Sequence, residues 1–208
     1  MECNGTIVLQ TIQLTDQTGA ALRLQFREII MVGFNRKYYF RIFLMSLPRI
    51  LVIMGSGETA PTMVTTHRRM TALLPSPVKA VVLDTPYGFQ ENAPELAAKA
   101  VEYFSTSINV DLVVAGLVRL HDTHIAADPV AIERGLRALS DADYIFAGPG
   151  SPTYALRQWA GSPVARIIND KLANGGIVTF ASAAALTLGR ATVPVYEVYK
   201  VGQDVTRL

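Results

Sequence analysis

One serine follows an apolar stretch near the end of the chain and could act as a nucleophile. The run "GIVTFA", residues 176–181, is followed by Ser182 and then by three alanines, residues 183–185. A serine nucleophile on a sharp strand-to-helix turn needs small neighbours, because strand and helix approach closely there. Its hydroxyl would lie at a helix N-terminus, where free N–H groups favour developing negative charge. The alternative is that Ser182 only caps the following helix, since serine is a favoured N-cap residue.

A glycine-rich loop precedes this region by one predicted strand and could hold an oxyanion. The residues Gly148, Pro149, Gly150 and Ser151 lie between an apolar run and the start of a helix. Backbone N–H groups at such a place point into the cleft, which is what an oxyanion hole requires. Proline has no N–H, so Gly150 is the predicted donor and the amide of Ala183 is the second. The alternative is a plain turn, because proline and glycine both favour turns.

Two further loops after predicted strands carry polar residues. The stretch "GSGE", residues 55–58, could bring backbone amides to an anion, but it lacks the third glycine of the dinucleotide fingerprint. We favour a tight turn there. The loop after Asp84 could form a substrate wall or only a capped turn. The residues predicted to contact a substrate are Tyr87, Gln90, Glu91 and Ser151.

The histidines of one loop fit hydrogen-bonded surface residues better than a metal site. His121 and His124 flank Asp122 in one loop, but there is no H-E-x-x-H pattern and no visible fourth ligand. We therefore expect no metal and no other cofactor. His121 follows a predicted strand, at the edge where ligands bind, and could still line the active cleft.

Short apolar runs alternate with helical patterns from Pro48 onward. Continuous β-branched runs fit strands buried on both faces, and Ser or Asp followed by Pro marks helix starts at Asp128, Ser151 and Ser162. Helices are also expected from Pro61 and within 91–106. Five alternations predict a flavodoxin-like, doubly wound, mostly parallel sheet in a three-layer α/β/α arrangement. The predicted strands are residues 49–55, 79–85, 111–117, 143–148 and 176–181, and a further strand is predicted over 192–202.

The composition excludes several classes of protein. Half of the 208 residues are apolar, and 19 basic residues nearly balance 17 acidic ones, so no nucleic-acid surface is expected. Cys3 is the only cysteine, which excludes an intrachain disulfide. The chain start lacks a secretory pattern, and the longest apolar region, 42–54, is interrupted and too short to cross a bilayer. We expect a soluble, cytoplasmic protein without a membrane partner.

The first 45 residues differ from the rest. Two extended runs surround the turn sequence Asp16-Gln17-Thr18-Gly19, which indicates a hairpin. A disordered tail is an alternative, and so is an upstream extension of the reading frame, because Met45 would make a natural start. The predicted division is therefore an N-terminal lead, 1–45, and an α/β domain, 46–208.

Two linked motifs resemble a known family. The stretches "DYIFAGPGSPTYALRQW", residues 143–159, and "LANGGIVTFASAAALTLG", residues 172–189, together resemble the peptidase E and cyanophycinase family of serine hydrolases. That family belongs to the class I glutamine-amidotransferase-like fold, and the match covers the chain from Pro48 onward. The family's glycines are replaced here by Pro149, Phe180 and Ala184.

The resemblance implies a serine peptidase mechanism. Ser182 would attack an amide carbonyl, the amides of Gly150 and Ala183 would stabilise the oxyanion, and a histidine would act as base. The substrate implied is a small peptide or amide, with cleavage at aspartyl peptide bonds. The glutaminase branch of the fold uses cysteine at this position, so serine disfavours it.

One element of that mechanism is missing from the sequence after Ser182. The family's histidine and its carboxylate partner follow the nucleophile, but no histidine follows Ser182, and Glu197 and Asp204 are the only acids there. Either the chain is C-terminally incomplete, or His121 is the base, or the serine is not catalytic. We expect an incomplete and inactive chain, whose exposed sheet surface would favour a homodimer. The alternative function is a non-catalytic α/β binding module for a small anionic ligand or a protein partner.

Overall fold

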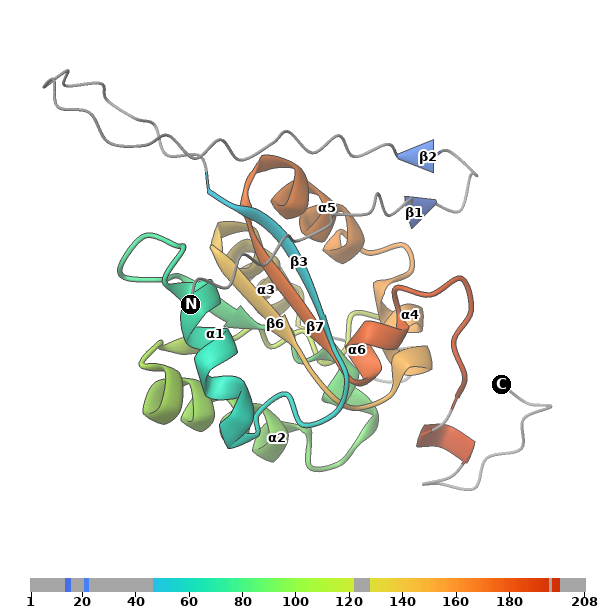
Figure 1. Ribbon diagram of the computed structural model, residues 1–208. Helices are drawn as coiled ribbons and strands as arrows, with labels where there is room; N and C mark the ends of the chain where they lie inside the picture. The colour runs from blue at the N-terminus through green and yellow to red at the C-terminus, as the bar shows by residue number, and fades with distance from the viewer. Residues whose placement is uncertain (1–13, 16–20, 23–46, 122–127, 195, 199–208) are drawn as a thin grey trace, which may run out of the picture. The chain divides into compact units, whose positions relative to one another are not determined.

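The computed structural model describes residues 14–15, 21–22, 47–121, 128–194 and 196–198 (Figure 1). The chain divides into two compact units, Met1–Leu44 and Met45–Leu208. In the first unit, strand β1 (Leu14–Thr15) pairs antiparallel with strand β2 (Ala21–Leu22), on either side of the segment in which the hairpin turn is predicted. The second unit contains everything described below.

The second unit is built on a five-stranded, wholly parallel sheet. Its strands run in the order β3-β7-β6-β4-β5, so the first strand of the unit lies at one edge. All five strands predicted between residues 49 and 181 are confirmed, each within three residues at either end. The sequence does not contain the strand order, because that order depends on long-range pairing. The strands are β3 (Arg49–Met54), β4 (Ala80–Val82), β5 (Leu112–Val114), β6 (Tyr144–Ala147) and β7 (Gly176–Ala181).

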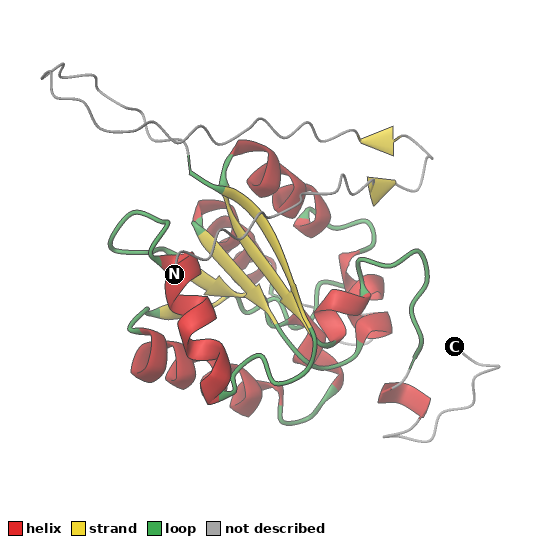
Figure 2. Cartoon of the chain, in the orientation of Figure 1, coloured by secondary structure: helices red, strands yellow, loops and turns green. Residues whose placement is uncertain are grey.

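Helices cover both faces of this sheet, as Figure 2 shows. Alternate side chains of each strand point to opposite faces and build two separate apolar cores. One core packs against α1 (Val64–Thr71) and α2 (Ala93–Tyr103), and the other against α3 (Pro129–Asp141), α4 (Pro152–Trp159) and α5 (Val164–Asn174). The predicted three-layer, doubly wound α/β fold is therefore confirmed.

Short turns complete the connections of the second unit. The 3-10 turns η1 (Pro61–Met63) and η2 (Thr85–Phe89) precede α1 and α2, and the π-helical turn η3 (Phe104–Ile108) follows α2. The last helix, α6 (Ala183–Leu186), is one turn long. Among the described residues, no helix combines the length and the apolarity that a membrane span requires.

The predicted helix starts are largely confirmed by the caps. The Asp128 side chain accepts a hydrogen bond from the Val130 amide at 2.9 Å and caps α3. The Ser151 hydroxyl accepts from the Tyr154 amide at 3.0 Å and caps α4. Helix α5 begins one residue later than its Ser-Pro signal predicts, because Pro163 occupies the N-cap position.

The connections after β4 and β6 leave these neighbouring strands in opposite directions. From β4 the chain passes through α2 on one face to β5, and from β6 it passes through α4 and α5 on the other face to β7. Such a switch point leaves a crevice at the carboxyl ends of the strands, where ligands bind in open parallel sheets.

The strand predicted over 192–202 is wrong for its described residues. Residues 192–194 have no regular structure, and residues 196–198 form a helical turn, in which the Val198 amide donates to the Pro194 carbonyl at 3.0 Å. The alternating apolar pattern was misleading here, because this segment packs on loops rather than joining the sheet.

Candidate active site

Ser182 occupies a strained turn between β7 and α6. Its backbone has φ 51° and ψ −118°, and apart from Asn109 it is the only non-glycine residue with positive φ in the described ranges. For a residue with a Cβ atom this conformation costs about 1–3 kcal/mol, so the surroundings must hold it in place. The Ser182 amide donates to the carbonyls of Met54 and Gly55, at 3.1 and 3.2 Å. Strand β3 and the loop after it therefore hold the turn.

The geometry disfavours a simple capping role for this serine. An N-cap residue normally has an extended backbone and accepts a hydrogen bond from the first turn of its helix. Ser182 has neither feature, because its φ is positive and its hydroxyl makes no capping bond to α6. The side chain is half-buried at the carboxyl end of β7, and the flanking residues Ala181, Ala183 and Ala184 are buried.

The loop after β6 lies directly against this turn. The Ala184 amide donates to the Gly148 carbonyl at 3.2 Å, which joins the two strand-end segments. Gly150 has φ 131°, and a Cβ atom there would lie 1.8 Å from the Pro86 carbonyl oxygen, so only glycine fits. Neither the Gly150 amide nor the Ala183 amide is a donor in any backbone hydrogen bond found in the described part of the chain. Within the described residues, both predicted oxyanion donors therefore lack a backbone acceptor.

Ser151 is more deeply buried than a substrate contact requires. Its amide donates to the Pro86 carbonyl at 2.9 Å, and its hydroxyl caps α4 and contacts Thr153 at 3.1 Å. The side chain is fully buried. These bonds account for Ser151 as a structural residue, and its contact with substrate stays a prediction.

The loop after β4 forms a wall of buried polar groups. Burial raises the pKa of Asp84 to about 6, although its Oδ1 accepts from the Leu117 amide at 2.8 Å. Burial, together with the negative charges of Glu58 and Asp84, raises the pKa of Tyr87. The Tyr87 hydroxyl lies so close to Gly148 that a Cβ built on that glycine would be 2.8 Å away.

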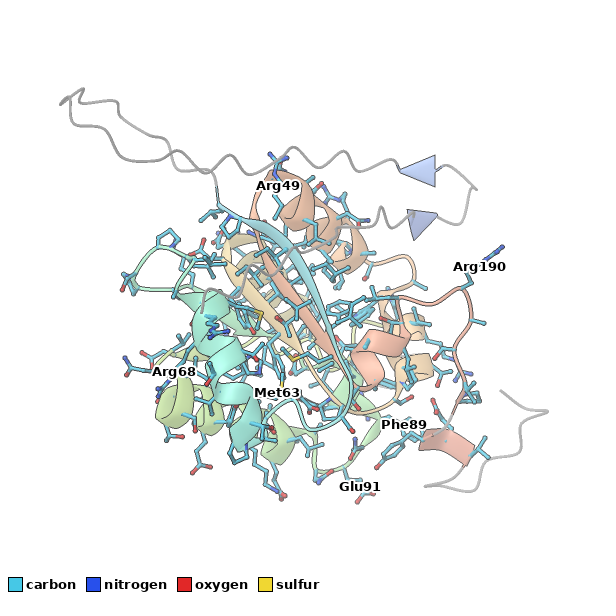
Figure 3. The ribbon with its side chains drawn as sticks, viewed as in Figure 1. Arg49, Met63, Arg68, Phe89, Glu91 and Arg190 are labelled. Atoms are coloured by element: carbon cyan, nitrogen blue, oxygen red, sulfur yellow. The ribbon has the colours of Figure 1, made fainter. Side chains whose placement is uncertain are left out.

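The two other predicted substrate contacts on this loop are more accessible. Gln90 is half-buried, and Glu91 is exposed and points away from the sheet in Figure 3. Tyr87, by contrast, is packed inside the protein. The contacts of Tyr87, Gln90 and Glu91 with a substrate stay predictions. Solvent reaches Gln90 in part and Glu91 fully.

The described histidines lie in two different environments. His67, on α1, is fully buried in the core, and burial lowers its pKa. His121 is exposed, and its backbone is held by Gln158 of α4, through bonds of 2.9 and 3.1 Å. Strand β5, which leads to His121, is three strands from β7, about 14 Å at the usual spacing. The structure gives no hydrogen bond between His121 and Ser182, and the base assignment stays a prediction.

Most of the loop in which a metal site was considered and disfavoured cannot be compared with the structure. Asp122 and His124 lie outside the described residues. Among the residues that are described, no group of three or more His, Cys, Asp or Glu side chains could hold a metal ion.

Glu197, one of the two acids that follow Ser182 in the sequence, is buried. It is 1% exposed, and its Oε1 accepts from the hydroxyls of Ser151, at 2.5 Å, and Thr153. Its Oε2 is buried and has no hydrogen-bond partner among the described residues. The one signal for it in the sequence is an isolated acid among valines and tyrosines in the segment 193–199.

Aromatic contacts fix the helical turn that carries Glu197. The rings of Phe89 and Tyr196 meet edge-on with centroids 5.6 Å apart, and Phe89 also contacts Tyr154 at 6.0 Å. Figure 3 shows Phe89 facing this turn. These contacts place Glu197 over the N-terminus of α4. The loop that begins at Gly148 lies between this terminus and the Ser182 turn.

The site combines a parallel α/β sheet with a strained serine turn and two free amides, an arrangement typical of serine hydrolases. No family model and no curated protein matches the chain. Among solved structures, it is similar to a peptidase from an acI-B1 Actinobacterium, with a TM-score of 0.56 and 20% sequence identity. That alignment covers 68% of this chain and 57% of the peptidase. A candidate peptidase E from Listeria monocytogenes EGD-e aligns with 16% identity over 65% of this chain and 59% of that one, at a TM-score of 0.39.

The first of these similarities concerns the fold. It confirms that the chain has the three-layer fold of a solved peptidase, which the resemblance to the peptidase E family predicted. The chain spans a little over half the length of that peptidase.

Proposed function

We propose that this chain carries the nucleophile region of a serine hydrolase of the peptidase E and cyanophycinase type, which cleaves amide bonds at aspartyl residues. The observation that carries the proposal is the backbone of Ser182, with φ 51° and ψ −118° at the junction of β7 and α6. Strain of this kind persists only where the surrounding structure holds it, and it concentrates at functional sites. The strand–turn–helix context is the one in which a nucleophilic serine occurs.

The mechanism follows from the groups around this turn. The Ser182 Oγ attacks the amide carbonyl of the substrate while its proton passes to a base. The N–H groups of Gly150 and Ala183 donate to the oxyanion of the tetrahedral intermediate. The C–N bond then breaks, the leaving amine takes the proton from the base, and water hydrolyses the acyl-enzyme. The Gly150 amide precedes α4, and the Ala183 amide is the first of α6. The N-terminus of a helix favours the negative charge that develops on the oxygen.

Glu197 is the proposed carboxylate of this mechanism. A catalytic carboxylate accepts a hydrogen bond from the base and stabilises its charged form. Glu197 is one of two acids after Ser182, and its Oε2 is a buried acceptor with no partner in the part of the chain that the structure describes. His121 is the proposed base, as the histidine that follows a strand on the ligand-binding side. Because β5 lies three strands from β7, this role requires the loop that carries His121 to reach across the sheet toward Ser182.

Covalent labelling tests the nucleophile. We expect a fluorophosphonate probe to label the protein at one site, and Ser182→Ala to abolish that labelling. Ser140→Ala, at an exposed serine on α3, is the matched control and keeps it. If the base and carboxylate are assigned correctly, His121→Ala and Glu197→Gln each slow labelling at least about a hundredfold. Labelling that persists in Ser182→Ala would contradict the proposal.

One observation favours the alternative, a non-catalytic binding module. The free amides of Gly150 and Ala183 suit a small anion whether or not Ser182 reacts. Saturable binding of inorganic phosphate or succinate, by a protein that no fluorophosphonate labels, would support the module. Weakened binding in Ala183→Pro, which removes one amide at the first position of α6, would place the ligand at this site.

A further inference from the structure

A chain of buried hydrogen bonds runs along one face of the sheet and ends at the loop beside Ser182. The Thr179 hydroxyl donates to the Tyr144 hydroxyl at 3.0 Å, and Tyr144 lies 3.0 Å from His67 Nδ1. His67 Nε2 lies 2.8 Å from the backbone carbonyl of Glu58. The side chains of Thr179, Tyr144 and His67 are all fully buried. The chain therefore runs from β7 through β6 and α1 to the loop after β3.

The chemistry of the end group fixes the direction of every bond. A carbonyl oxygen can only accept, so His67 Nε2 carries the proton and Nδ1 is an acceptor. Tyr144 must then donate its hydroxyl proton to Nδ1, and its oxygen accepts from Thr179. Every donor and acceptor in the chain is used once, and the carbonyl of Glu58 is held by a neutral imidazole.

An apolar side chain would fill the position of His67 at lower cost. The ring packs edge-on against Tyr103, Phe104 and Phe146, with centroids 5.0–6.0 Å apart, so the environment suits an aromatic residue. A buried imidazole must instead be desolvated and fully partnered. Unlike a phenylalanine, the histidine can donate a hydrogen bond to the loop after β3.

That loop forms one side of the Ser182 turn. The Gly55 carbonyl accepts from the Ser182 amide, and three residues later Glu58 is held by His67. A second anchor lies two residues further along, where the Tyr103 hydroxyl donates to the Ala60 carbonyl at 3.2 Å. The loop is thus anchored to the helical layer at Glu58 and Ala60, and to the Ser182 turn at Gly55.

We propose that His67 is a positioning residue for the nucleophile, holding the loop of residues 55–60 so that Gly55 keeps Ser182 in its strained conformation. This rests on the proposed function, in which Ser182 is the nucleophile. His67 itself touches neither the substrate nor the reacting atoms.

Two amide substitutions of different length test this. Glutamine reaches the position of Nε2 and can donate to the Glu58 carbonyl, whereas asparagine ends near Nδ1 and cannot. In His67→Asn we expect hydrogen exchange of the Ser182 amide to rise about tenfold, and the rate of fluorophosphonate labelling to fall about tenfold. In His67→Gln both quantities stay within about threefold of the parent protein. Phe104→Leu, which perturbs the same core without touching the loop, is the control for lost packing.

The outcomes separate the positioning role from the proposed function. If no variant is ever labelled but hydrogen exchange of the Ser182 amide rises only in His67→Asn, the positioning role of His67 is supported. The assignment of Ser182 as the nucleophile is then contradicted. If labelling occurs but His67→Asn and Phe104→Leu raise exchange equally, the positioning is overturned.

A further variant applies if His67→Asn does not fold. Tyr103→Phe removes only the anchor at Ala60, from a half-buried position. If His67 is the main anchor, exchange at Ser182 changes less than about threefold. A tenfold rise in Tyr103→Phe would transfer the role to Tyr103 and overturn the proposal.

Discussion

The two faces of the central sheet are packed in different ways. On the face of α3, α4 and α5 the core is apolar, with Trp159 stacked on Phe180 at a centroid distance of 5.8 Å. On the face of α1 and α2 the core contains the polar chain of Thr179, Tyr144 and His67. The loops around Ser182 are tied to the second face through Glu58. The apolar face thus stabilises the fold, whereas the polar face also holds the loop that positions Ser182.

The largest expected effect is on the apolar face. Phe180→Ala removes a side chain that is 2% exposed and leaves a cavity beside Trp159. We expect the free energy of unfolding to fall by about 3–5 kcal/mol, as measured by chemical denaturation. Phe180→Leu, which keeps most of the volume, is the control and loses less. Equal losses in both would mean that the cavity does not set the cost.

The next effect depends on pH, at the strand end of the polar face. The folded-state pKa of Asp84 is raised to about 6, so the stability contributed by its neutral form is full below pH 3.8 and lost as pH rises through about 6. Asp84→Asn keeps the Oδ1 acceptor for the Leu117 amide without the charge. We expect it to stabilise the fold by up to about 3 kcal/mol at pH 8 and by nearly nothing at pH 3.5. Denaturation at both pH values checks this, and a gain of the same size at both would contradict it.

A smaller effect is expected in the middle of the polar face. Tyr144→Phe leaves His67 Nδ1 and the Thr179 hydroxyl without their partner in a buried site. We expect a loss of about 1–3 kcal/mol in the free energy of unfolding. Adding Thr179→Val should recover part of that loss, since it removes one of the two stranded groups. A double variant less stable than the sum of the two single variants would argue against a shared chain.

The smallest effect concerns the strain at the junction of the two faces. Ser182→Gly places at φ 51° the one residue that adopts positive φ without steric cost. We expect this variant to be more stable than Ser182→Ala, which keeps a Cβ atom, by about 1 kcal/mol. The difference in thermal midpoint between the two variants measures the strain. Identical midpoints would show that the turn is unstrained.

The sequence predicts the parts of the molecule that depend on neighbouring residues. The five strands, the caps at Asp128 and Ser151, and the place of Ser182 after a strand all follow from local patterns. The strand order and the partners of His67 do not, because Tyr144 lies 77 residues away from His67 along the chain. The burial of Glu197 could not be predicted for a related reason. Its segment alternates like a strand, and only the hydroxyls of Ser151 and Thr153 explain its burial.

The close approach at Gly150 has a consequence for redesign of the protein. A single β-carbon at this position would overlap the Pro86 carbonyl, which also accepts from the Ser151 amide. Any library that varies the loop after β6 must therefore keep residue 150 fixed, or vary η2 together with it. Transplanting either loop alone onto another scaffold would separate two segments whose shapes are defined only by each other.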